Sequence, residues 1–307
     1  MEVKLSPLEE LLLQPVKYYV EQKGKNIRKH ICSILGTLLG VDEKSIENID
    51  KLIGYIHNAS LVIDDIQDNS LLRRNQECAH IKYGIPFSIN AGYFTIFKIL
   101  NEMNKNEEIN ETIRHKIVEN IYYTHMGQGM DIYYTLHKII PSLEEYNTMI
   151  EYKTGILFVT ILDLLMEKTT NVIVKKKYND LRVCISNFAL FFQIRDDYVN
   201  LTDLNYWKEK GFCQDFDEQK ISYLIVYCNT HKLEDCETIN ELLKKPDKTN
   251  EDKIELLMLM KNNDLFDIIY DKLVELKCIV LNLLNISAIF EEMKFHKFNE
   301  NDLLSYL

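Results

Sequence analysis

The sequence predicts an all-α fold, and three observations support this prediction. The chain has 307 residues, 46% of them hydrophobic, so it can bury a large core. It contains only ten glycines and five prolines, which leaves few signals for turns. It also lacks the alternation of short apolar strands with glycine-rich turns that is typical of β proteins. We therefore expect long helices, arranged as one large domain or as two smaller ones.

Breaks between these helices can be placed by runs of polar and turn-forming residues. We expect breaks near Gly24, at residues 69–84 and 101–111, near Pro141, and at residues 205–211 and 244–252. None of these segments is long enough to be a flexible linker, and no internal repeat or low-complexity tract appears. The sequence thus indicates a continuous helical chain.

The segment before the first acidic pair shows helical spacing clearly. Apolar and small residues recur at three- and four-residue steps from Leu52 to Ile63 and lead directly into Asp64. Asp64 and Asp68 stand four residues apart, so on a helix both carboxylates project from one face, about one turn apart. Mg²⁺ takes oxygen ligands and is commonly completed by substrate phosphates. This spacing therefore predicts part of a metal and diphosphate site.

A second acidic pair, Asp196 and Asp197, follows another apolar run past the middle of the chain. Three phenylalanines within residues 188–192 lead into it, and Asn200 lies one turn beyond. An acidic pair on its own is more often a solvated face. Here both pairs end strongly apolar helical runs, so we expect them at the mouth of a core rather than on an outer surface.

Charge and cysteine content exclude several classes of protein. The net charge of −11 argues against a nucleic-acid-binding surface. Seven scattered cysteines without a CxxC pair argue against a disulfide framework or a zinc site and indicate a reducing compartment. The first 13 residues do not resemble a signal peptide, and residues 273–290 fall short of the ~20 apolar residues that a membrane span needs. We expect a soluble cytoplasmic protein.

Basic side chains in short, distinctive contexts could neutralise a diphosphate. Lys25 and Arg28 lie three apart at an expected helix start, where backbone N–H groups also favour an anion. His57 precedes the first acidic pair by two turns. Each position also has an explanation that involves no ligand. Paired cations often lie on a solvated helix face, and a lone histidine is often a hydrogen-bonded core residue. The candidate set is Gly24, Lys25, Arg28, His57, Arg73 and Arg74.

The two acidic motifs resemble the aspartate-rich regions of trans-isoprenyl diphosphate synthases, and most of all those of animal and fungal geranylgeranyl diphosphate synthases. The string from His57 to Ser70, followed by Leu72-Arg73-Arg74, is similar to the first region, and Phe191 to Tyr198 to the second. The resemblance covers nearly the whole chain and includes residues 125–129, 153–155 and 210–213. It implies a class I isoprenoid synthase fold, with residues 1–307 as one large helical domain around a central apolar cavity.

The resemblance also implies a Mg²⁺-dependent prenyltransferase that joins isopentenyl diphosphate to an allylic prenyl diphosphate, with geranylgeranyl diphosphate as the expected product. Three Mg²⁺ ions would be held by Asp64, Asp68 and Asp196. The allylic diphosphate would contact Arg73, Lys153, Lys210 and Lys220. Isopentenyl diphosphate would contact Gly24, Lys25, Arg28, His57 and Arg74. Thr154 and Gln193 would stabilise the allylic cation, and the protein would be a homodimer.

Product length is expected to depend on Ala59 and Ser60, because the growing tail should run along the helix away from Asp64. In the family, small residues here leave the pocket open for twenty carbons, whereas aromatic residues close it at fifteen. Tyr93 is a candidate for the deeper floor. The structural alternative is that Ala59 and Ser60 only allow close helix packing and that the aromatic residue belongs to the ordinary core.

The chain departs from the family pattern around the expected hydrocarbon cavity and lid. Gln219 and Ile156 stand where glycine is usual, Tyr93 replaces a common asparagine, and residues 134–136 replace a Trp-Arg-Asp sequence. A terpene synthase that cyclises geranylgeranyl or farnesyl diphosphate would show such a pattern, and it is the first alternative. The retained acceptor residues, Lys25 and Arg28 among them, favour elongation. A non-catalytic subunit of a heteromeric synthase is the second alternative, although such a subunit has no need of costly paired carboxylates.

Overall fold

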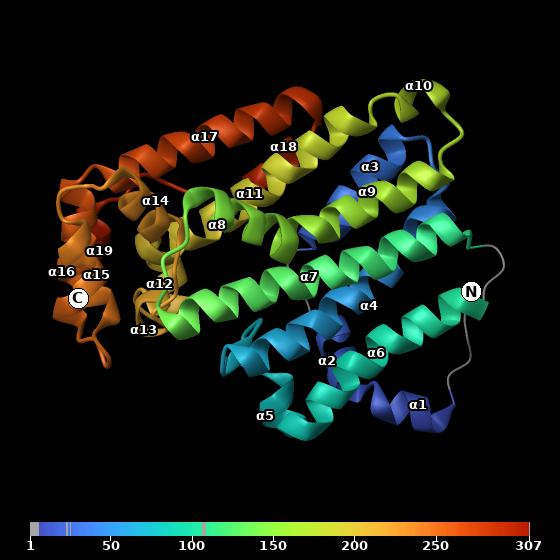
Figure 1. The fold of residues 1–307 in the computed structure, drawn as a ribbon, viewed down its shortest axis with the longest axis horizontal. Coiled ribbons are helices and arrows are strands. Elements are labelled where there is room, and N and C mark those ends of the chain that lie inside the picture. The colour runs from blue at the N-terminus through green and yellow to red at the C-terminus, as the bar shows by residue number, and fades with distance from the viewer. Residues whose placement is uncertain (1–5, 23, 25, 106–108, 307) are drawn as a thin grey trace. The chain divides into compact units, whose positions relative to one another are not determined.

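The computed structural model describes residues 6–22, 24, 26–105 and 109–306, apart from the side chains of Val174, Glu209, Lys210, Leu304, Ser305 and Tyr306. This part of the chain is almost entirely helical (Figure 1), and its one hairpin consists of β1 (Leu72–Arg73) and β2 (Gln76–Glu77). The predicted all-α fold is confirmed. None of the helices described is long and apolar enough to cross a membrane. The chain divides into two compact units.

The first unit comprises Met1–Thr124 and Ile156–Arg182. Its central helix is α4 (Glu43–Gln67), which packs against α2 (Gln14–Glu21), α3 (Ile27–Leu38), α5 (Ala79–Tyr83), α6 (Ile85–Lys105) and α9 (Ile156–Lys168). The other elements are α1 (Pro7–Leu12), α10 (Val172–Lys175), the hairpin and the first half of α7 (Glu111–His137). Helix α4 is therefore the scaffold of this unit.

The second unit comprises His125–Gly155 and Val183–Leu307. It contains the end of α7, α8 (Leu143–Ile150), the π-helical turn η1 (Glu151–Gly155), most of α11 (Tyr178–Thr202), α12 (Leu204–Lys210), α13 (Gln214–Asp217), α14 (Tyr223–His231), α15 (Cys236–Lys244), α16 (Asn250–Asn262), α17 (Leu265–Leu283), α18 (Ser287–Glu292) and α19 (Glu300–Tyr306). Helix α14 packs against α8, α15 and α17.

The ends of the helices follow local capping chemistry. Helix α4 begins after Asp42, whose carboxylate accepts a hydrogen bond from the backbone N–H of Ser45 at 2.9 Å. The predicted break at residues 205–211 is wrong, because Asp203 caps α12 through the backbone N–H of Asn205 at 2.8 Å. Helix α12 stops at Gly211, whose φ of 106° favours glycine. The expected breaks near Gly24 and Pro141 are confirmed.

Helices α4 and α6 approach each other closely because small residues lie at their contact. A Cβ added to Gly92 on α6 would lie 2.8 Å from a side-chain carbon of Ile63 and 3.2 Å from the carbonyl oxygen of Ala59. Ala59 itself has no exposed surface and belongs to a core cluster that includes Val16, Val62 and other residues of the first unit. Interiors pack this densely only when side-chain volumes match the available space. Ala59 is therefore a packing residue of α4.

The turn η1 lies against the backbone of α7 in the second unit. A Cβ on Gly127 of α7 would lie 2.3 Å from the backbone nitrogen of Lys153 and 2.7 Å from the carbonyl carbon of Tyr152. Real Cβ atoms do not come so close to backbone atoms, so only glycine fits this position. A π turn is rare and redirects side chains relative to a regular helix. Here it carries Lys153 and Thr154, two of the predicted site residues.

We expect Gly127→Ala to destabilise the protein, because the methyl group would force the backbones of α7 and η1 apart. Overpacking of this kind typically costs ~1–3 kcal/mol. Thermal unfolding followed by circular dichroism would measure the loss as a lower Tm.

Gly129→Ala is the matched control, because Gly129 lies on the same helix and nothing lies within 4 Å of a Cβ built there. Alanine is the better helix former by ~1 kcal/mol, so this variant should be as stable as the wild type or more stable. Equal Tm values for the two variants would contradict the tight contact between α7 and η1.

Candidate active site

The first acidic site is the end of α4 in the first unit. Asp64 lies in the last turn and is partly exposed, and Asp68, the residue that caps the helix, is exposed. The backbone N–H of Asp68 donates to the carbonyl oxygen of Asp64 at 2.9 Å, so the two residues are one helical turn apart as predicted. Two accessible carboxylates with only oxygen donors fit Mg²⁺, which is usually bound by one or two carboxylates and completed by water or phosphate.

Asp65, the second member of the pair, has no exposed surface, and its carboxylate binds the guanidinium group of Arg73. The Nε atom of Arg73 donates to Oδ1 of Asp65 at 2.9 Å, its Nη2 atom also contacts this carboxylate, and the same Nη2 lies 3.4 Å from Asp64. Burial alone would lower the pKa of Arg73, but Asp65 and Asp64 outweigh it and raise that pKa. Arg73 stands on β1, in a segment expected as a break that instead folds into the hairpin and α5. The hairpin thus delivers a fixed cation beside the acidic pair.

Tyr19 of α2 closes this arrangement from the other side. Its ring is fully buried, and its hydroxyl donates to Asp65 while accepting the backbone N–H of Ala79 at 2.9 Å. Burial and the neighbouring Asp65 carboxylate raise the pKa of the Tyr19 hydroxyl, which keeps it protonated as a donor. The sequence does not reveal this residue, because 46 positions separate it from its partner.

Arginines from α3 and from the hairpin surround His57 of α4. Arg28 forms an ion pair of 3.4 Å with Asp50 of α4, and Arg74 donates to the carbonyl oxygen of Tyr19 at 2.7 Å. Burial, followed by the charges of Arg28, Arg74 and Arg73, lowers the pKa of His57 to about 3. The imidazole is therefore neutral at physiological pH, in a pocket that is strongly favourable to an anion.

Two glycines make room for these guanidinium groups. A Cβ on Gly24 would lie 3.2 Å from Nε of Arg74, and a Cβ on Gly54 of α4 would lie 3.2 Å from Nη2 of Arg28. The structure thus brings four of the residues predicted to bind isopentenyl diphosphate into one unit: Gly24, Arg28, His57 and Arg74. The fifth, Lys25, lies outside the described residues.

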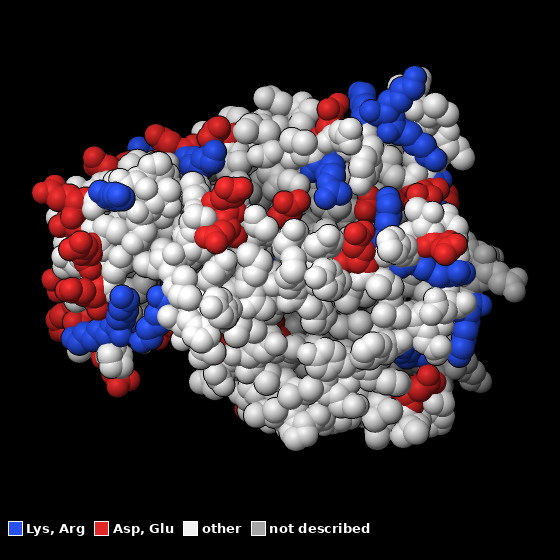
Figure 2. Space-filling model, in the orientation of Figure 1, with Lys and Arg blue, Asp and Glu red and all other residues white. Residues whose placement is uncertain are grey.

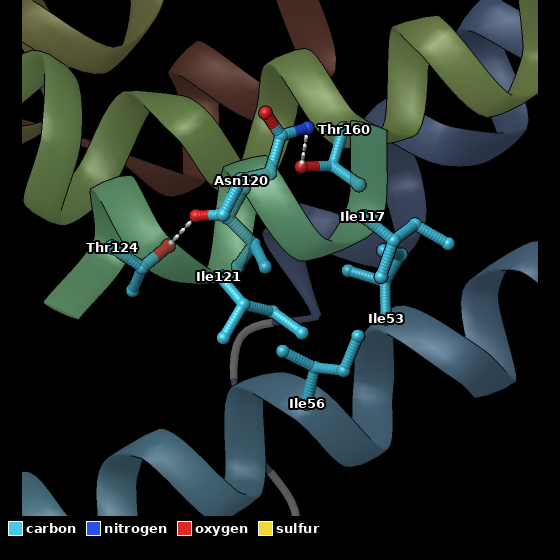
Figure 3. Close-up of a pocket in the computed structure, with 8 residues that line it drawn as sticks. Ile53, Ile56, Ile117, Asn120, Ile121, Thr124 and Thr160 are labelled. Carbon is cyan, nitrogen blue, oxygen red and sulfur yellow. Dashed lines mark hydrogen bonds between the residues drawn. The ribbon is translucent and has the colours of Figure 1, made fainter. Parts of the chain in front are cut away.

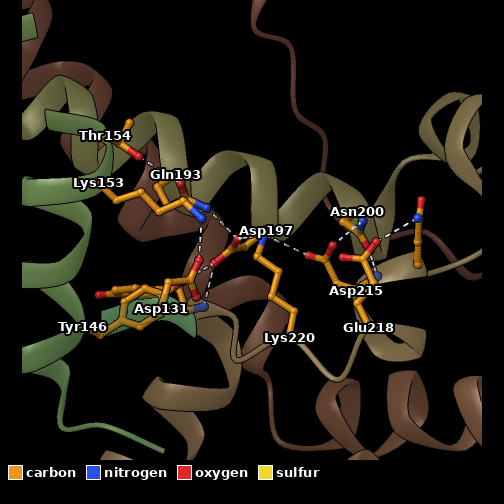
Figure 4. A network of polar contacts seen from close by, with 12 residues as sticks. Asp131, Tyr146, Lys153, Thr154, Gln193, Asp197, Asn200, Asp215, Glu218 and Lys220 are labelled. Carbon is orange, nitrogen blue, oxygen red and sulfur yellow. Dashed lines mark hydrogen bonds and ion pairs between the residues drawn. The ribbon is translucent and has the colours of Figure 1, made fainter. Parts of the chain in front are cut away.

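The second acidic site is on α11 in the second unit (Figure 4). Asp196 is partly exposed, whereas Asp197 is fully buried. The Asp197 carboxylate accepts from the Tyr146 hydroxyl at 2.7 Å, the Gln193 amide at 3.0 Å, the Lys220 ammonium at 3.3 Å and the backbone N–H of Tyr223 at 2.8 Å. One aspartate of this pair is thus directed outward and the other is used to hold its neighbours.

Three predicted residues lie together beside Asp197. The hydroxyl of Thr154 donates to the Gln193 side-chain carbonyl at 3.3 Å, and Gln193 donates in turn to Asp197. Lys153 forms a 2.5 Å ion pair with Asp131 of α7 (Figure 4). Asp131 is a partner that the sequence gives no reason to select. The roles predicted for Lys153, Thr154 and Gln193 stay predictions, but their proximity is observed.

Asp215 is a further member of this site that motif spacing does not identify. It is buried, its Oδ2 lies 3.6 Å from Nζ of Lys220, and its Oδ1 accepts the Asn200 amide at 2.9 Å. Burial raises the pKa of Asp215 to about 7, because the Lys220 ammonium only partly offsets the cost of desolvation. For Lys220, burial would lower the pKa, but Asp215, Asp197 and Asp196 raise it well above its ordinary value. The side chain of Lys210 is outside the described part of the chain.

A small cavity lies in the first unit between α4, α7 and α9 (Figure 3), and it has room for about one water molecule. Its lining is mostly apolar: Ile53, Ile56, Ile117, Ile121 and Leu157, with Asn120, Thr124 and Thr160. The Asn120 amide donates to the Thr160 hydroxyl at 2.8 Å.

The three residues predicted to set product length lie in different environments. Ser60 stands four residues after Ile56 and four before Asp64, so it shares the face of α4 that runs from the acidic site to the cavity. Ala59 is instead buried against α6, and Tyr93 on α6 is 38% exposed. Ser60 is partly buried, and its hydroxyl donates to the carbonyl oxygen of His57 at 2.8 Å.

Neither acidic site is a preformed metal cage. In the part of the chain that the structure describes, no group of three or more His, Cys, Asp or Glu side chains is arranged to hold a metal ion. Asp64 and Asp68 alone would leave most positions of an octahedral Mg²⁺ ion to water or to a ligand, which is typical of ions that bind with a phosphorylated substrate.

Comparison with known proteins gives the same family as the sequence motifs. A family model described as polyprenyl synthetase matches residues 9–260. A geranylgeranyl pyrophosphate synthase of Dictyostelium discoideum is 37% identical over 216 residues, which are 70% of this chain and 69% of that protein. One of Mucor circinelloides f. lusitanicus is 33% identical over 253 residues, which are 82% of this chain and 81% of that protein.

Terpene synthases are also similar to this chain. The quiannulatene synthase of Emericella variicolor is 34% identical over 220 residues, which are 71% of this chain but only 29% of that much longer protein. The family model nevertheless extends from the N-terminal helices through the whole of both acidic sites. The chain belongs to the polyprenyl synthetase family.

Proposed function

We propose that this protein is a Mg²⁺-dependent trans-prenyltransferase that condenses isopentenyl diphosphate with an allylic prenyl diphosphate, with geranylgeranyl diphosphate as the product. The observation that carries the proposal is that the first unit holds Arg28 and Arg74 around neutral His57 in addition to the Arg73 cation bound to Asp65. Three arginines with different partners suit an enzyme that takes two diphosphate substrates. A cyclase needs only one.

The allylic substrate must lose its diphosphate by cleavage of the carbon–oxygen bond. Arg73 and Lys220 are each held by a buried carboxylate, so each cation can bind a diphosphate without reorganising, which is the most effective form of electrostatic stabilisation. Polyprenyl synthetases generally depend on Mg²⁺. Three Mg²⁺ ions are proposed, with Asp64, Asp68 and Asp196 as their protein ligands, and such ions would supply positive charge to the diphosphate oxygens during ionisation.

The carbocation left by ionisation must then be protected from water and from nucleophiles. Thr154 and Gln193 present neutral oxygens that can stabilise positive charge, and their mutual hydrogen bond holds them in place. The double bond of isopentenyl diphosphate attacks this cation and forms the new carbon–carbon bond. The released diphosphate can take the proton that is then lost, so no protein base is required.

His57 contributes to the acceptor cluster as a neutral donor. With a pKa of about 3, its imidazole carries one N–H group and no charge. The positive charge that binds isopentenyl diphosphate is therefore supplied by the arginines, whose geometry is set by Asp50, Gly24 and Gly54.

We also propose that the protein is a homodimer through the exposed face of α6. Ile85, Ile89, Tyr93 and Phe97 follow each other at four-residue steps along this helix and are 37–65% exposed. Figure 2 shows that the surface over α5 and α6 is largely free of charged side chains. Apolar patches of this extent commonly mark interfaces, and a twofold axis would let the same stripe cover itself.

Cyclisation of an allylic diphosphate remains the second candidate function. It is favoured by the similarity to quiannulatene synthase and by the departures from the family pattern at Gln219 and Ile156. Supplying pure protein and Mg²⁺ with isopentenyl diphosphate and an allylic starter, or with geranylgeranyl diphosphate alone, separates the two functions. An elongating enzyme yields a longer diphosphate from the first mixture, whereas a cyclase yields a hydrocarbon from geranylgeranyl diphosphate alone.

Asp64→Ala and Asp196→Ala should each abolish turnover while the helical content stays unchanged, because both side chains are partly exposed and are not core contacts. Loss of one such charge contact typically costs ~3–4 kcal/mol of the barrier, or more than 10²-fold in kcat. Steady-state kinetics and far-UV circular dichroism check both parts. A chelator should inhibit the wild type completely, with recovery on added Mg²⁺, and near-normal activity of either variant would refute the proposed metal sites.

Arg28→Ala separates elongation from cyclisation. For an elongating enzyme, the KM for isopentenyl diphosphate should rise by ~10-fold or more, since a charge-assisted guanidinium–phosphate contact is lost. The KM for the allylic substrate should change little. If the protein is a cyclase, the variant should form hydrocarbon from geranylgeranyl diphosphate at the wild-type rate.

Ser60→Phe should shorten the product, because a ring at this point of α4 would block the path between Asp64 and the cavity about one turn, ~5.4 Å, below the carboxylate. Ala59→Phe should mainly destabilise the protein, since its ring would enter the contact with Gly92. Product analysis by chromatography, together with the Tm of both variants, tests this. A normal product from a stable Ser60→Phe protein would show that the tail does not pass this residue.

A further inference from the structure

Both acidic sites contain the same three-part arrangement, although they lie in different units and on unrelated stretches of sequence. In each, the second aspartate of the pair is fully buried, a fully buried tyrosine donates its hydroxyl to that carboxylate, and a basic side chain is bound to the same carboxylate. The groups are Tyr19, Asp65 and Arg73 in one unit, and Tyr146, Asp197 and Lys220 in the other.

We propose that Tyr19 and Tyr146 are positioning residues for diphosphate binding: each orients the buried aspartate that holds a diphosphate-binding cation, and neither buried aspartate is a metal ligand. The inference rests on the proposed function only in that it assigns a diphosphate to Arg73 and Lys220. It goes beyond that proposal by assigning a role to two buried tyrosines that contact neither metal nor substrate in it.

The hydrogen-bonding capacity of the buried carboxylates supports this division. Asp197 accepts from four donors, so its lone pairs are fully used and none is left to coordinate a metal ion. In Asp65, Oδ2 accepts from the Tyr19 hydroxyl, and Nε of Arg73 lies 2.9 Å from Oδ1 and 3.2 Å from Oδ2. A metal ion at either carboxylate would have to displace a charged partner in a buried position, at a large desolvation cost.

The tyrosines can orient these aspartates because they are themselves immobile. Tyr19 has no exposed surface, packs at 5.8 Å from the ring of Tyr18, and also accepts the N–H of Ala79. Tyr146 has 1% exposed surface and packs edge-on against Tyr223, with the ring centroids 5.9 Å apart. Each hydroxyl thus reaches the carboxylate from a rigid core and leaves the opposite side open for the cation.

Each tyrosine has a matched control in its own unit. Tyr18 is adjacent to Tyr19 on α2, and its hydroxyl donates to the carbonyl oxygen of Glu77 at 3.1 Å. Tyr198 of α11 is fully buried, and its hydroxyl donates to the carbonyl oxygen of His296 at 3.0 Å. Their Phe variants also lose one hydroxyl and one hydrogen bond, but not one to an aspartate of the sites.

The test measures the affinity of each variant for inorganic pyrophosphate at saturating Mg²⁺ by isothermal titration calorimetry. Tyr19→Phe and Tyr146→Phe should each weaken pyrophosphate binding by about 10- to 100-fold, in line with the loss of a hydrogen bond to a charged group. Tyr18→Phe and Tyr198→Phe should bind as the wild type does. The Mg²⁺ concentration for half-maximal binding should be the same in all five proteins.

A double-mutant cycle distinguishes positioning from a general loss of stability. In an Arg73→Ala background, Tyr19→Phe should cause little further loss of pyrophosphate affinity, because the cation that the tyrosine positions is already gone. The same holds for Tyr146→Phe in a Lys220→Ala background. If the two tyrosines are only structural, the losses of pyrophosphate affinity in the single variants should add in the double variant. The control variants Tyr18→Phe and Tyr198→Phe should then lose as much affinity as Tyr19→Phe and Tyr146→Phe.

The outcomes also separate this inference from the proposed function. If the wild type binds pyrophosphate and the Tyr19 and Tyr146 variants bind it equally tightly, the positioning role is wrong and the proposed function is untouched. If those variants instead require more Mg²⁺, the buried aspartates are metal ligands and the inference is overturned. If the wild type binds no pyrophosphate with Mg²⁺ present, the proposed function itself fails.

Discussion

A carboxylate without any contact with water must be compensated completely, and this requirement shapes both units of the protein. Asp65 and Asp197 are ionisable groups with no exposed surface. An isolated buried charge costs several kcal/mol, so each must be surrounded by donors and a cation in a defined geometry. The hairpin that carries Arg73 and the position of α2 beside α4 both follow from what Asp65 needs. In the second unit, Lys220 and the start of α14 are arranged around Asp197 in the same way.

The same compensation explains why the outward aspartates can remain partly exposed. Asp64 and Asp196 follow directly on apolar helical runs, where uncompensated negative charge would otherwise recruit nearby cations. The strongest cations near them are already engaged, with Arg73 chiefly on Asp65 and Lys220 shared between Asp197 and Asp215. The outward carboxylates Asp64 and Asp196 stay partly exposed. The ion pairs of Asp65 with Arg73 and of Asp197 with Lys220 thus allow a strongly acidic motif to lie on a stable helix.

Much of this structure could be predicted from the sequence because it depends on spacing. Helical periodicity before Asp64 and the four-residue step to Asp68 place both carboxylates on one face, and the structure has them there. The family resemblance is also confirmed. Spacing cannot show, however, which of two adjacent aspartates turns inward, since that depends on Tyr19 and Tyr146, each about fifty residues away. The π turn around Lys153 was equally hidden, because it depends on the close approach of Gly127.

Other differences between prediction and structure have local causes. Residues 205–211 looked like a break but form a helix, because one carboxylate, that of Asp203, supplies the missing cap. Ala59 and Ser60 were predicted to set product length together, although a rotation of ~100° between neighbours on a helix places Ala59 against α6 and Ser60 on a different face of α4. Helical periodicity does not identify Asp215, because loops separate it in the sequence from its partners Asn200 and Lys220.

The narrowness of the cavity beside α4 has a consequence for how chain length would be decided. A space for about one water molecule cannot hold a prenyl tail unless Ile53, Ile56 and their neighbours change rotamers. Each five-carbon extension buries apolar surface worth ~4 kcal/mol, at ~0.8 kcal/mol per carbon, while each step deeper displaces more packed side chains. Under the proposed function, elongation would stop where these two free energies cancel and not at a rigid wall. Chain length set in this way would respond to temperature, because core repacking and apolar transfer have different heat capacities.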